Sequence, residues 1–217
     1  VLKNTNTFGQ LTVSRGNVQI GEAGVGTSGL GVTNLAGGTT NPAIISGTGT
    51  VRAGLFVSGG SINPGDNGGT SIGTLQINGN LNFTGVTAAQ TVGNFTLGAG
   101  GISDRINVTG DVRLTGNGSL SVLFDSGYTP TLGDSWTLID WNGTLFQNDF
   151  NLGDNLRTGA DADGNEGNLN LADLTASGYR WNVGTDTGAL VVTIVPEPSV
   201  AMLSVLAVAG FAGRRRR

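Results

Sequence analysis

The sequence contains no cysteine and no histidine. The chain therefore forms no disulfide, carries no thiol nucleophile and holds neither a Cys/His zinc site nor a Ser-His-Asp triad. Charged residues make up only 12% of the chain, against about 25% in soluble domains. Proline is scarce, at 5 of 217 residues, while glycine is abundant, at 39. This composition is neither collagen-like nor typical of a disordered tail.

The few charges are unevenly distributed along the chain. The net charge is −4, but four of the eleven basic residues are Arg214–Arg217. Residues 1–213 carry seven basic and fifteen acidic residues, a net charge of −8. Such an acidic body does not suit nucleic acid, so we expect no nucleic-acid partner. The chain begins at Val1 without a secretion leader, and we expect it to be a fragment or a processed form.

Residues 1–127 consist of short runs that alternate apolar and polar residues, separated by Gly, Asn and Ser. This alternation places Leu, Val, Ile and Phe on one face of each predicted strand. Turn sequences such as Asn78-Gly79 and Asn63-Pro64-Gly65-Asp66 separate the runs. The expected strands are 10–14, 17–20, 49–53, 55–57, 73–77, 80–83, 94–97, 105–109, 111–115 and 119–124.

Strands this short bury little core unless they stack, and loosely repeated pairs of strands around a Gly-polar corner indicate stacked rungs. We therefore predict an all-β fold, a right-handed parallel β-helix (solenoid). A β-sandwich has the same alternation and is the alternative fold.

Residues 128–195 differ in texture, because they hold all three tryptophans, both tyrosines and most of the acids. We expect a strand over 136–141 and a closing hairpin over 179–195. A solenoid needs a terminal cap to cover the end of its core, and large aromatic residues would provide one. The alternative role for Trp136, Trp141, Trp181 and Tyr179 is a platform for stacking sugars, whereas buried packing is the commoner fate of such residues.

The C-terminal residues 196–217 form a third part of the chain. Pro196-Glu197-Pro198 ends the β region, because two prolines in three residues cannot continue a strand ladder. An uncharged run from Ser199 to Gly213 follows, and Arg214, Arg215, Arg216 and Arg217 close the chain. The run is shorter than the ~20 residues of an ordinary transmembrane helix. We still favour a transmembrane helix over a core helix, because terminal arginines are typical of a cytoplasmic stop.

This ordered series resembles the PEP-CTERM sorting signal of Gram-negative bacteria, over about residues 195–217. The resemblance implies that exosortase, a membrane protease/transpeptidase, is a partner that cuts near the Pro-Glu-Pro. It also implies that Pro196, Glu197 and Pro198 are recognition residues and that Arg214 to Arg217 are the retention charge. The protein would be held in the inner membrane and then released to the cell surface or matrix.

A second resemblance covers part of the body. The segment from Ser61 to Leu81 reads SINPGDNGGTSIGTLQINGNL and resembles the autotransporter-associated β-strand repeat. Residues 103–110 (SDRINVTG) and 133–140 (GDSWTLID) are similar to strings that follow this repeat in such proteins. The resemblance implies a parallel β-helix of a surface protein. Thr70-Ser71-Ile72 is inserted relative to the usual spacing, which predicts a longer corner loop there.

An acidic loop is the only candidate metal site. Residues 161–167 place oxygen ligands at alternating positions, as calcium loops do. The twelfth position from Asp161 is Ala172, where an EF-hand needs a bidentate glutamate, so the standard loop is ruled out. A looser calcium site would use Asp161, Asp163, Asn165 and either Glu166 or Asp173. We favour a solvated acidic loop and expect no cofactor.

Without Cys and His, only carboxylate, Ser/Thr, Lys/Arg or Tyr chemistry remains available for catalysis. Asp104 and Arg105 resemble the charged pairs that polysaccharide lyases place on a β-helix face. Glycoside hydrolysis needs two carboxyl groups about 5–9 Å apart, which Asp104, Asp111 and Asp125 would supply only if the rungs align them. An Asp entering a turn is ordinary, and we favour that interpretation of Asp104.

These patterns together predict an exported structural or adhesive protein of the cell surface or extracellular matrix, which is not an enzyme. Its partners would be exosortase, the inner membrane and a surface polysaccharide. The alternative function is a β-helix enzyme or a carbohydrate-binding module that acts on polysaccharide.

Overall fold

The computed structural model describes residues 10–13, 16–19, 29–30, 32–35, 43–52, 54–65, 71–83, 91–116, 118–148, 150–159, 167–185 and 188–197. Their regular structure is almost entirely β, with two single 3₁₀ turns, η1 (Ala99–Gly101) and η2 (Thr175–Ser177). The all-β prediction is therefore confirmed for this part of the chain. The predicted C-terminal helix lies outside the described residues.

The strands form three sheets, and the chain visits these sheets in rotation. Sheet I contains, in spatial order, β1 (Gln10–Val13), β4 (Val32–Leu35), β7 (Leu55–Val57), β10 (Leu81–Phe83), β13 (Val112–Thr115) and β16 (Leu145–Asn148). Sheet II contains β18 (Leu169–Asn170), β14 (Ser119–Phe124), β11 (Thr91–Leu97), β8 (Ser61–Pro64), β5 (Ala43–Gly47) and β2 (Gly16–Gln19).

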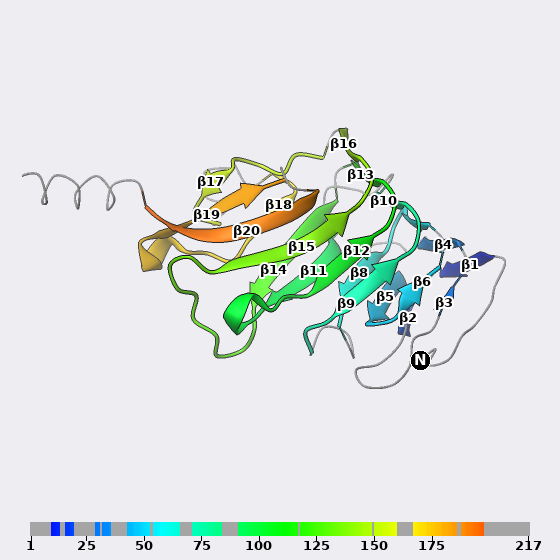
Figure 1. The fold of residues 1–217 in the computed structure, drawn as a ribbon, viewed down its shortest axis with the longest axis horizontal. Helices are drawn as coiled ribbons and strands as arrows, with labels where there is room; N and C mark the ends of the chain where they lie inside the picture. The colour runs from blue at the N-terminus through cyan, green and yellow to red at the C-terminus, as the bar shows by residue number, and fades with distance from the viewer. Residues whose placement is uncertain are drawn as a thin grey trace, which may run out of the picture.

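Sheet III contains β17 (Leu156–Arg157), β19 (Tyr179–Gly184), β20 (Ala189–Pro196), β15 (Ser135–Trp141), β12 (Arg105–Val108), β9 (Thr74–Ile77), β6 (Thr50–Val51) and β3 (Gly29–Leu30). From β1 to β13, each strand pairs in parallel with the strand three places later in the chain. Figure 1 shows this progression from the blue strands near the N-terminus to the orange β20 at the opposite end.

We call one passage of the chain through the three sheets a coil. Each coil contains three strands, one more than the sequence repeats indicated. The prediction missed β5, and it assigned Asn63 and Pro64 to a turn, whereas Ser61–Pro64 form the buried strand β8. The turn follows this strand at Gly65, whose φ is +88°. A Cβ at Gly65 would lie 1.9 Å from the carbonyl oxygen of Ser71, so only glycine fits this corner.

The coils lengthen along the chain, as the paired positions of sheet I show. Gln10 pairs with Val32, and Leu55 pairs with Leu81. Leu81 pairs in turn with Val112, and Val112 with Leu145, so the sequence separation between partners grows from each of these pairs to the next. Part of the added length lies in longer strands, since β11 and β15 contain 7 residues each whereas β7 contains 3, and the rest lies in the connections. The irregular period explains why the repeat is hard to recognise in the sequence.

The core lies between the three sheets, because alternate residues of each strand point inward and stack on their partners in the next coil. In sheet III, for example, Val51, Ile77, Val108 and Trp141 occupy successive paired positions and are all buried. The largest of these interior side chains, Trp141, stands at the C-terminal end of the row.

Antiparallel strands close sheet III at its C-terminal end. β20 pairs antiparallel with β15 and with β19, and β19 pairs antiparallel with β17. The predicted hairpin over residues 179–195 is confirmed, with Tyr179 opposite Pro196 and Gly184 opposite Val191. Because β20 runs antiparallel to β15, the parallel pairing of strands in sheet III ends at β15.

Candidate functional site

The first part of the predicted sorting motif is attached to the body of the protein. Pro196 is the last residue of β20. The next backbone amide, that of Glu197, donates a hydrogen bond of 3.2 Å to the carbonyl oxygen of Gly178. The Glu197 carboxylate lies 3.5 Å from the Arg180 guanidinium, and about a third of each side chain is exposed. Glu197 is therefore held against β19, not extended away from the body.

The remaining predicted sorting residues lie outside the described part of the chain. They are Pro198, the segment from Ser199 to Gly213, and Arg214, Arg215, Arg216 and Arg217. Among the described residues, no helix has the length and apolar character needed to cross a membrane.

Asp104 is buried at a corner between coils, not exposed on a sheet face. Its carboxylate accepts hydrogen bonds from the backbone amides of Gly73, at 2.9 Å, and Thr96, at 2.8 Å, and the residue is 1% exposed. Gly73 precedes β9 and Thr96 belongs to β11, so Asp104 connects two successive coils. Burial raises the pKa of this carboxyl from 3.8 to about 6, although the two amide hydrogen bonds oppose the rise.

The side chains of Asp104 and Arg105 lie in different surroundings, although the two residues are adjacent in the chain. Arg105 opens β12 and forms an ion pair with Asp140 on the outer face of sheet III. Asp111 lies beyond the opposite end of β12, where its Oδ1 accepts the Thr144 amide at 3.0 Å. Asp125 is close enough to raise the pKa of Asp104 slightly. Because both oxygens of Asp104 are hydrogen-bonded in the interior, this cluster offers no accessible acid and base.

Aromatic residues of the C-terminal part pack in a cluster around two buried indoles. Trp136 and Trp181 are 1% and 0% exposed, and their ring centroids are 6.0 Å apart. Phe124 stacks on Trp181 at 5.5 Å, and Tyr128 meets Trp136 edge-on at 6.0 Å. Both indoles donate to backbone carbonyl oxygens, Trp136 to Gly98 and Trp181 to Ala172, each at 2.8 Å. Trp141 is also buried, at 7% exposure, so the three indoles offer no sugar-stacking platform and the packing interpretation is correct for them. Tyr179, the fourth predicted residue, is only partly buried and packs against the same core.

The calcium ligands predicted at Asp161, Asp163 and Asn165 lie outside the described residues, as does Glu166. Asp173, the remaining candidate, accepts hydrogen bonds from the hydroxyl and the amide of Thr175, which lower its pKa. These bonds form a local turn at η2. The described residues contain no group of three or more acidic side chains arranged to hold a metal ion.

A hollow of about 230 Å³ lies beside β16 and β19. Its lining is mainly polar and includes Gln147, Asn151, Asn155, Gly184 and Thr185. No ionisable side chain from the described part of the chain lines it, so these residues offer hydrogen bonds but no acid, base or charged ligand for a metal.

Sequence reasoning missed a row of outward-facing residues on sheet I. Phe56 pairs with Asn82, Asn82 with Arg113, and Arg113 with Phe146, on four adjacent strands. Their strand neighbours Leu55, Val57, Leu81, Phe83, Val112 and Leu114 are buried in the core, so these four side chains lie on the outer face. We call this set the outward row of sheet I. The signal in the sequence was Phe56, an apolar residue that strand alternation places on the face opposite to Leu55 and Val57.

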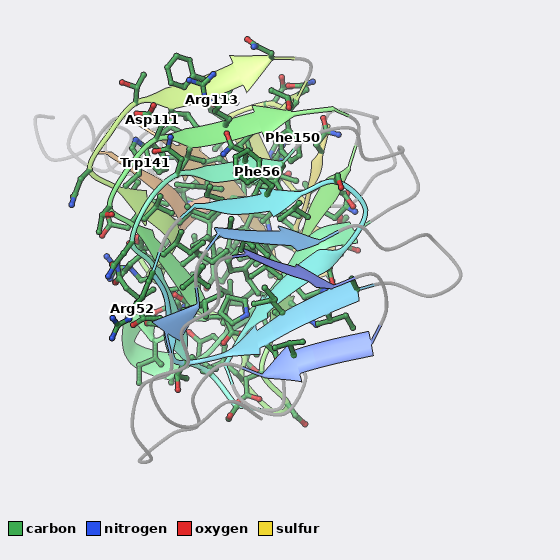
Figure 2. The ribbon with its side chains drawn as sticks, turned by 90° about the vertical axis from the view of Figure 1, so that its right-hand side faces the viewer. Arg52, Phe56, Asp111, Arg113, Trp141 and Phe150 are labelled. Atoms are coloured by element: carbon green, nitrogen blue, oxygen red, sulfur yellow. The ribbon has the colours of Figure 1, made fainter. Side chains whose placement is uncertain are left out.

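The outward row combines aromatic and polar side chains in direct contact. The Arg113 guanidinium centre lies 4.2 Å from the ring centroid of Phe146, within the range of a cation–π contact. Arg113 also lies 3.9 Å from the Asp111 carboxylate. Figure 2 shows Asp111 and Arg113 close together near the top of the view, with Phe56 further down the same stack of strands.

No protein-family model matches the chain, and no curated protein matches it.

Proposed function

We propose that this chain is an exported structural or adhesive protein of the bacterial cell surface or extracellular matrix. Its body would be a right-handed parallel β-helix that is closed at one end by residues 128–195. A C-terminal signal, read by an exosortase-type protease, would direct its sorting. The proposal joins a body in which the candidate catalytic residue Asp104 is enclosed to a tail that resembles a sorting signal.

The observation that carries the body's role is the rotation of the chain through three sheets with parallel pairing at every step from β1 to β15. Parallel connections within one sheet are right-handed in nearly all proteins, which supports the right-handed winding. In such a body the strand amides and carbonyls are satisfied between coils, and stability is distributed along a rod. A rod of this kind suits a persistent surface element.

The observation that supports sorting is the position of Pro196 and Glu197. They follow directly on β20, the strand that closes the body, so a cut near this point would leave every described strand intact. The apolar run and the four arginines follow in the sequence. The order of these parts is that of a folded domain, a processing site and a membrane stop.

The enzymatic alternative finds no support at its candidate residues. Asp104 is enclosed, with both oxygens engaged by backbone amides, and these contacts favour a structural role. A carbohydrate-binding role is compatible with the outward row of sheet I, which is accessible and carries aromatic and polar groups.

The test of sorting is fractionation of cells that express an exosortase system. Replacement of Pro196, Glu197 and Pro198 by alanine should retain the full-length protein in the inner membrane and abolish release of the shorter form. A matched control replaces Thr129 and Pro130, in a loop before β15, by alanine and should leave release unchanged. Normal release and size of the motif variant would contradict the proposed sorting.

A further inference from the structure

The outward row of sheet I forms a strip of paired positions on four adjacent strands. Asn82 lies in the middle of this row and is only 6% exposed. Phe56, on one side of Asn82, is 43% exposed, and the Arg113 side chain, on the other, is 46% exposed. Adjacent strands are about 4.8 Å apart, so the three steps from Phe56 to Phe146 span about 14 Å.

The strip is held in place by contacts on the outer face. Arg113 contacts both the Phe146 ring and the Asp111 carboxylate. Asp111 is fixed in turn, because its Oδ1 accepts the amide of Thr144 and its own amide donates to Asn80 Oδ1 at 2.9 Å. A ligand would therefore meet groups that are already positioned, which lowers the entropy lost on binding.

Size and charge restrict the kind of ligand. A stable protein interface buries about 800 Å² on each partner, whereas the row offers only two partly exposed aromatic rings as apolar surface. The chain has a net charge of −4, which repels acidic polymers, and Asp111 offsets the charge of Arg113 locally. What remains is an uncharged, hydroxyl-rich chain with apolar ring faces, which is the chemistry of a neutral glycan.

We infer that the outward row of sheet I binds a neutral polysaccharide chain lying across the strands. The C–H face of a sugar ring would pack on Phe56, and hydroxyl groups would accept from the Arg113 guanidinium and donate to the Asp111 carboxylate. Phe146 would hold Arg113 flat against the surface. This inference deepens the adhesive part of the proposed function, and it does not depend on the sorting signal.

The test is native affinity electrophoresis of the purified chain in gels that contain hydroxyethyl cellulose or arabinoxylan as neutral glycans. Alginate and polygalacturonate serve as acidic counterparts. At least one neutral glycan should retard the protein, and Phe56→Ser should weaken the apparent affinity at least fivefold. Arg113→Lys keeps the charge but removes the planar group, and it should weaken binding as well. Thermal melts of every variant establish that it is folded.

Leu123→Ser is the matched control, because Leu123 is 61% exposed on the outer face of sheet II. Its affinity should equal that of the unsubstituted chain. The inference is overturned if no neutral glycan retards the protein, if Leu123→Ser loses as much affinity as Phe56→Ser, or if only acidic glycans bind. Self-association in sedimentation that Phe56→Ser abolishes would assign the row to a second copy of the chain instead. Failure of this test leaves the sorting test unaffected, since fractionation reads only the C-terminal motif.

Discussion

In the parallel coils, the interior positions are filled mostly by aliphatic side chains that stack on an equivalent residue in the next coil, as Leu55, Leu81 and Val112 do in sheet I. In the closing region, formed by β15 and β17 to β20, the interior contains indoles from separate segments that pack at several angles. The coils thus depend on repetition, whereas the closing region depends on a few large side chains. Substitutions in the two regions should therefore differ in cost.

The largest effect is expected in the aromatic cluster. Trp181→Ala removes a fully buried indole that stacks on Phe124 and hydrogen-bonds to the Ala172 carbonyl oxygen. We expect a loss of about 3–5 kcal/mol in the free energy of unfolding, as for other buried Trp-to-Ala changes. Chemical denaturation measures it. Leu123→Ala, on an exposed position of the coils, should change stability by less than about 0.5 kcal/mol. Equal losses would contradict the role of Trp181 in packing the closing region.

The second effect concerns pH and the buried carboxyl between two coils. Asp104 has a pKa near 6 in the folded protein and an ordinary value of 3.8, so the folded state holds this proton more tightly. Its contribution to stability is greatest below about pH 4 and is lost as the pH rises to about 6, a change of about 3 kcal/mol. Asp104→Asn should remove this dependence. Chemical denaturation at pH 4 and pH 6.5 measures the free energy of unfolding at each pH. If the variant loses as much stability between these pH values as the unsubstituted protein, the role of Asp104 is contradicted.

The closing region titrates in the opposite sense. Burial of Asp134 would raise its pKa, but hydrogen bonds from Tyr128 and Thr131 outweigh that effect and lower it. A carboxyl group whose pKa is lowered in the folded protein stabilises the fold at pH values above its ordinary pKa. This contribution is lost as the pH falls. The coil corner and the closing region are therefore distinguishable by pH, since Asp104 acts between pH 4 and 6 and Asp134 acts at lower pH.

The third effect tests the close stacking of coil corners. The Gly110 amide donates to the Gly79 carbonyl oxygen at 3.0 Å, and the Gly143 amide donates to Gly110 in the same way. A Cβ at Gly110 would lie 2.2 Å from Asn80 Oδ1 and 2.8 Å from the Gly79 carbonyl oxygen. Gly110→Ala should cost about 1–3 kcal/mol through overpacking. Gly184→Ala in β19, where a Cβ meets nothing within 4 Å, is the control. A neutral Gly110→Ala would contradict tight corner stacking.

These differences also mark what the sequence could reveal. The strand over Ser119–Phe124 matches its predicted bounds, because strict alternation is a local property. Ser61–Pro64 was missed because Asn63-Pro64-Gly65 carries strong turn chemistry. Pairing with β5 and a hydrogen bond from Asn94 Nδ2 to Asn63 Oδ1, at 2.7 Å, overrule that local preference.

The outward row was missed for a related reason. Its four residues come from four different coils and lie far apart in the sequence, so their alignment depends on the register between distant strands. No single strand contains that information, and the lengthening of successive coils hides the period. The burial of Asp104 was equally hidden, since its hydrogen-bond partners are Gly73, which precedes β9, and Thr96, which belongs to β11.

The smallest effect on stability is expected where the closing region meets the sorting motif. Arg180→Ala removes the 3.5 Å contact with Glu197, a partly exposed ion pair worth at most about 1 kcal/mol. The amide of Glu197 would keep its hydrogen bond to Gly178, so β20 should stay paired. The freed Glu197 side chain should be more accessible to a protease, and we expect faster release in the fractionation assay with an almost unchanged unfolding midpoint. Arg113→Ala on sheet I removes a comparably exposed ion pair and should not change the rate of release. Slower release from Arg180→Ala would mean that the protease requires Glu197 in its docked position.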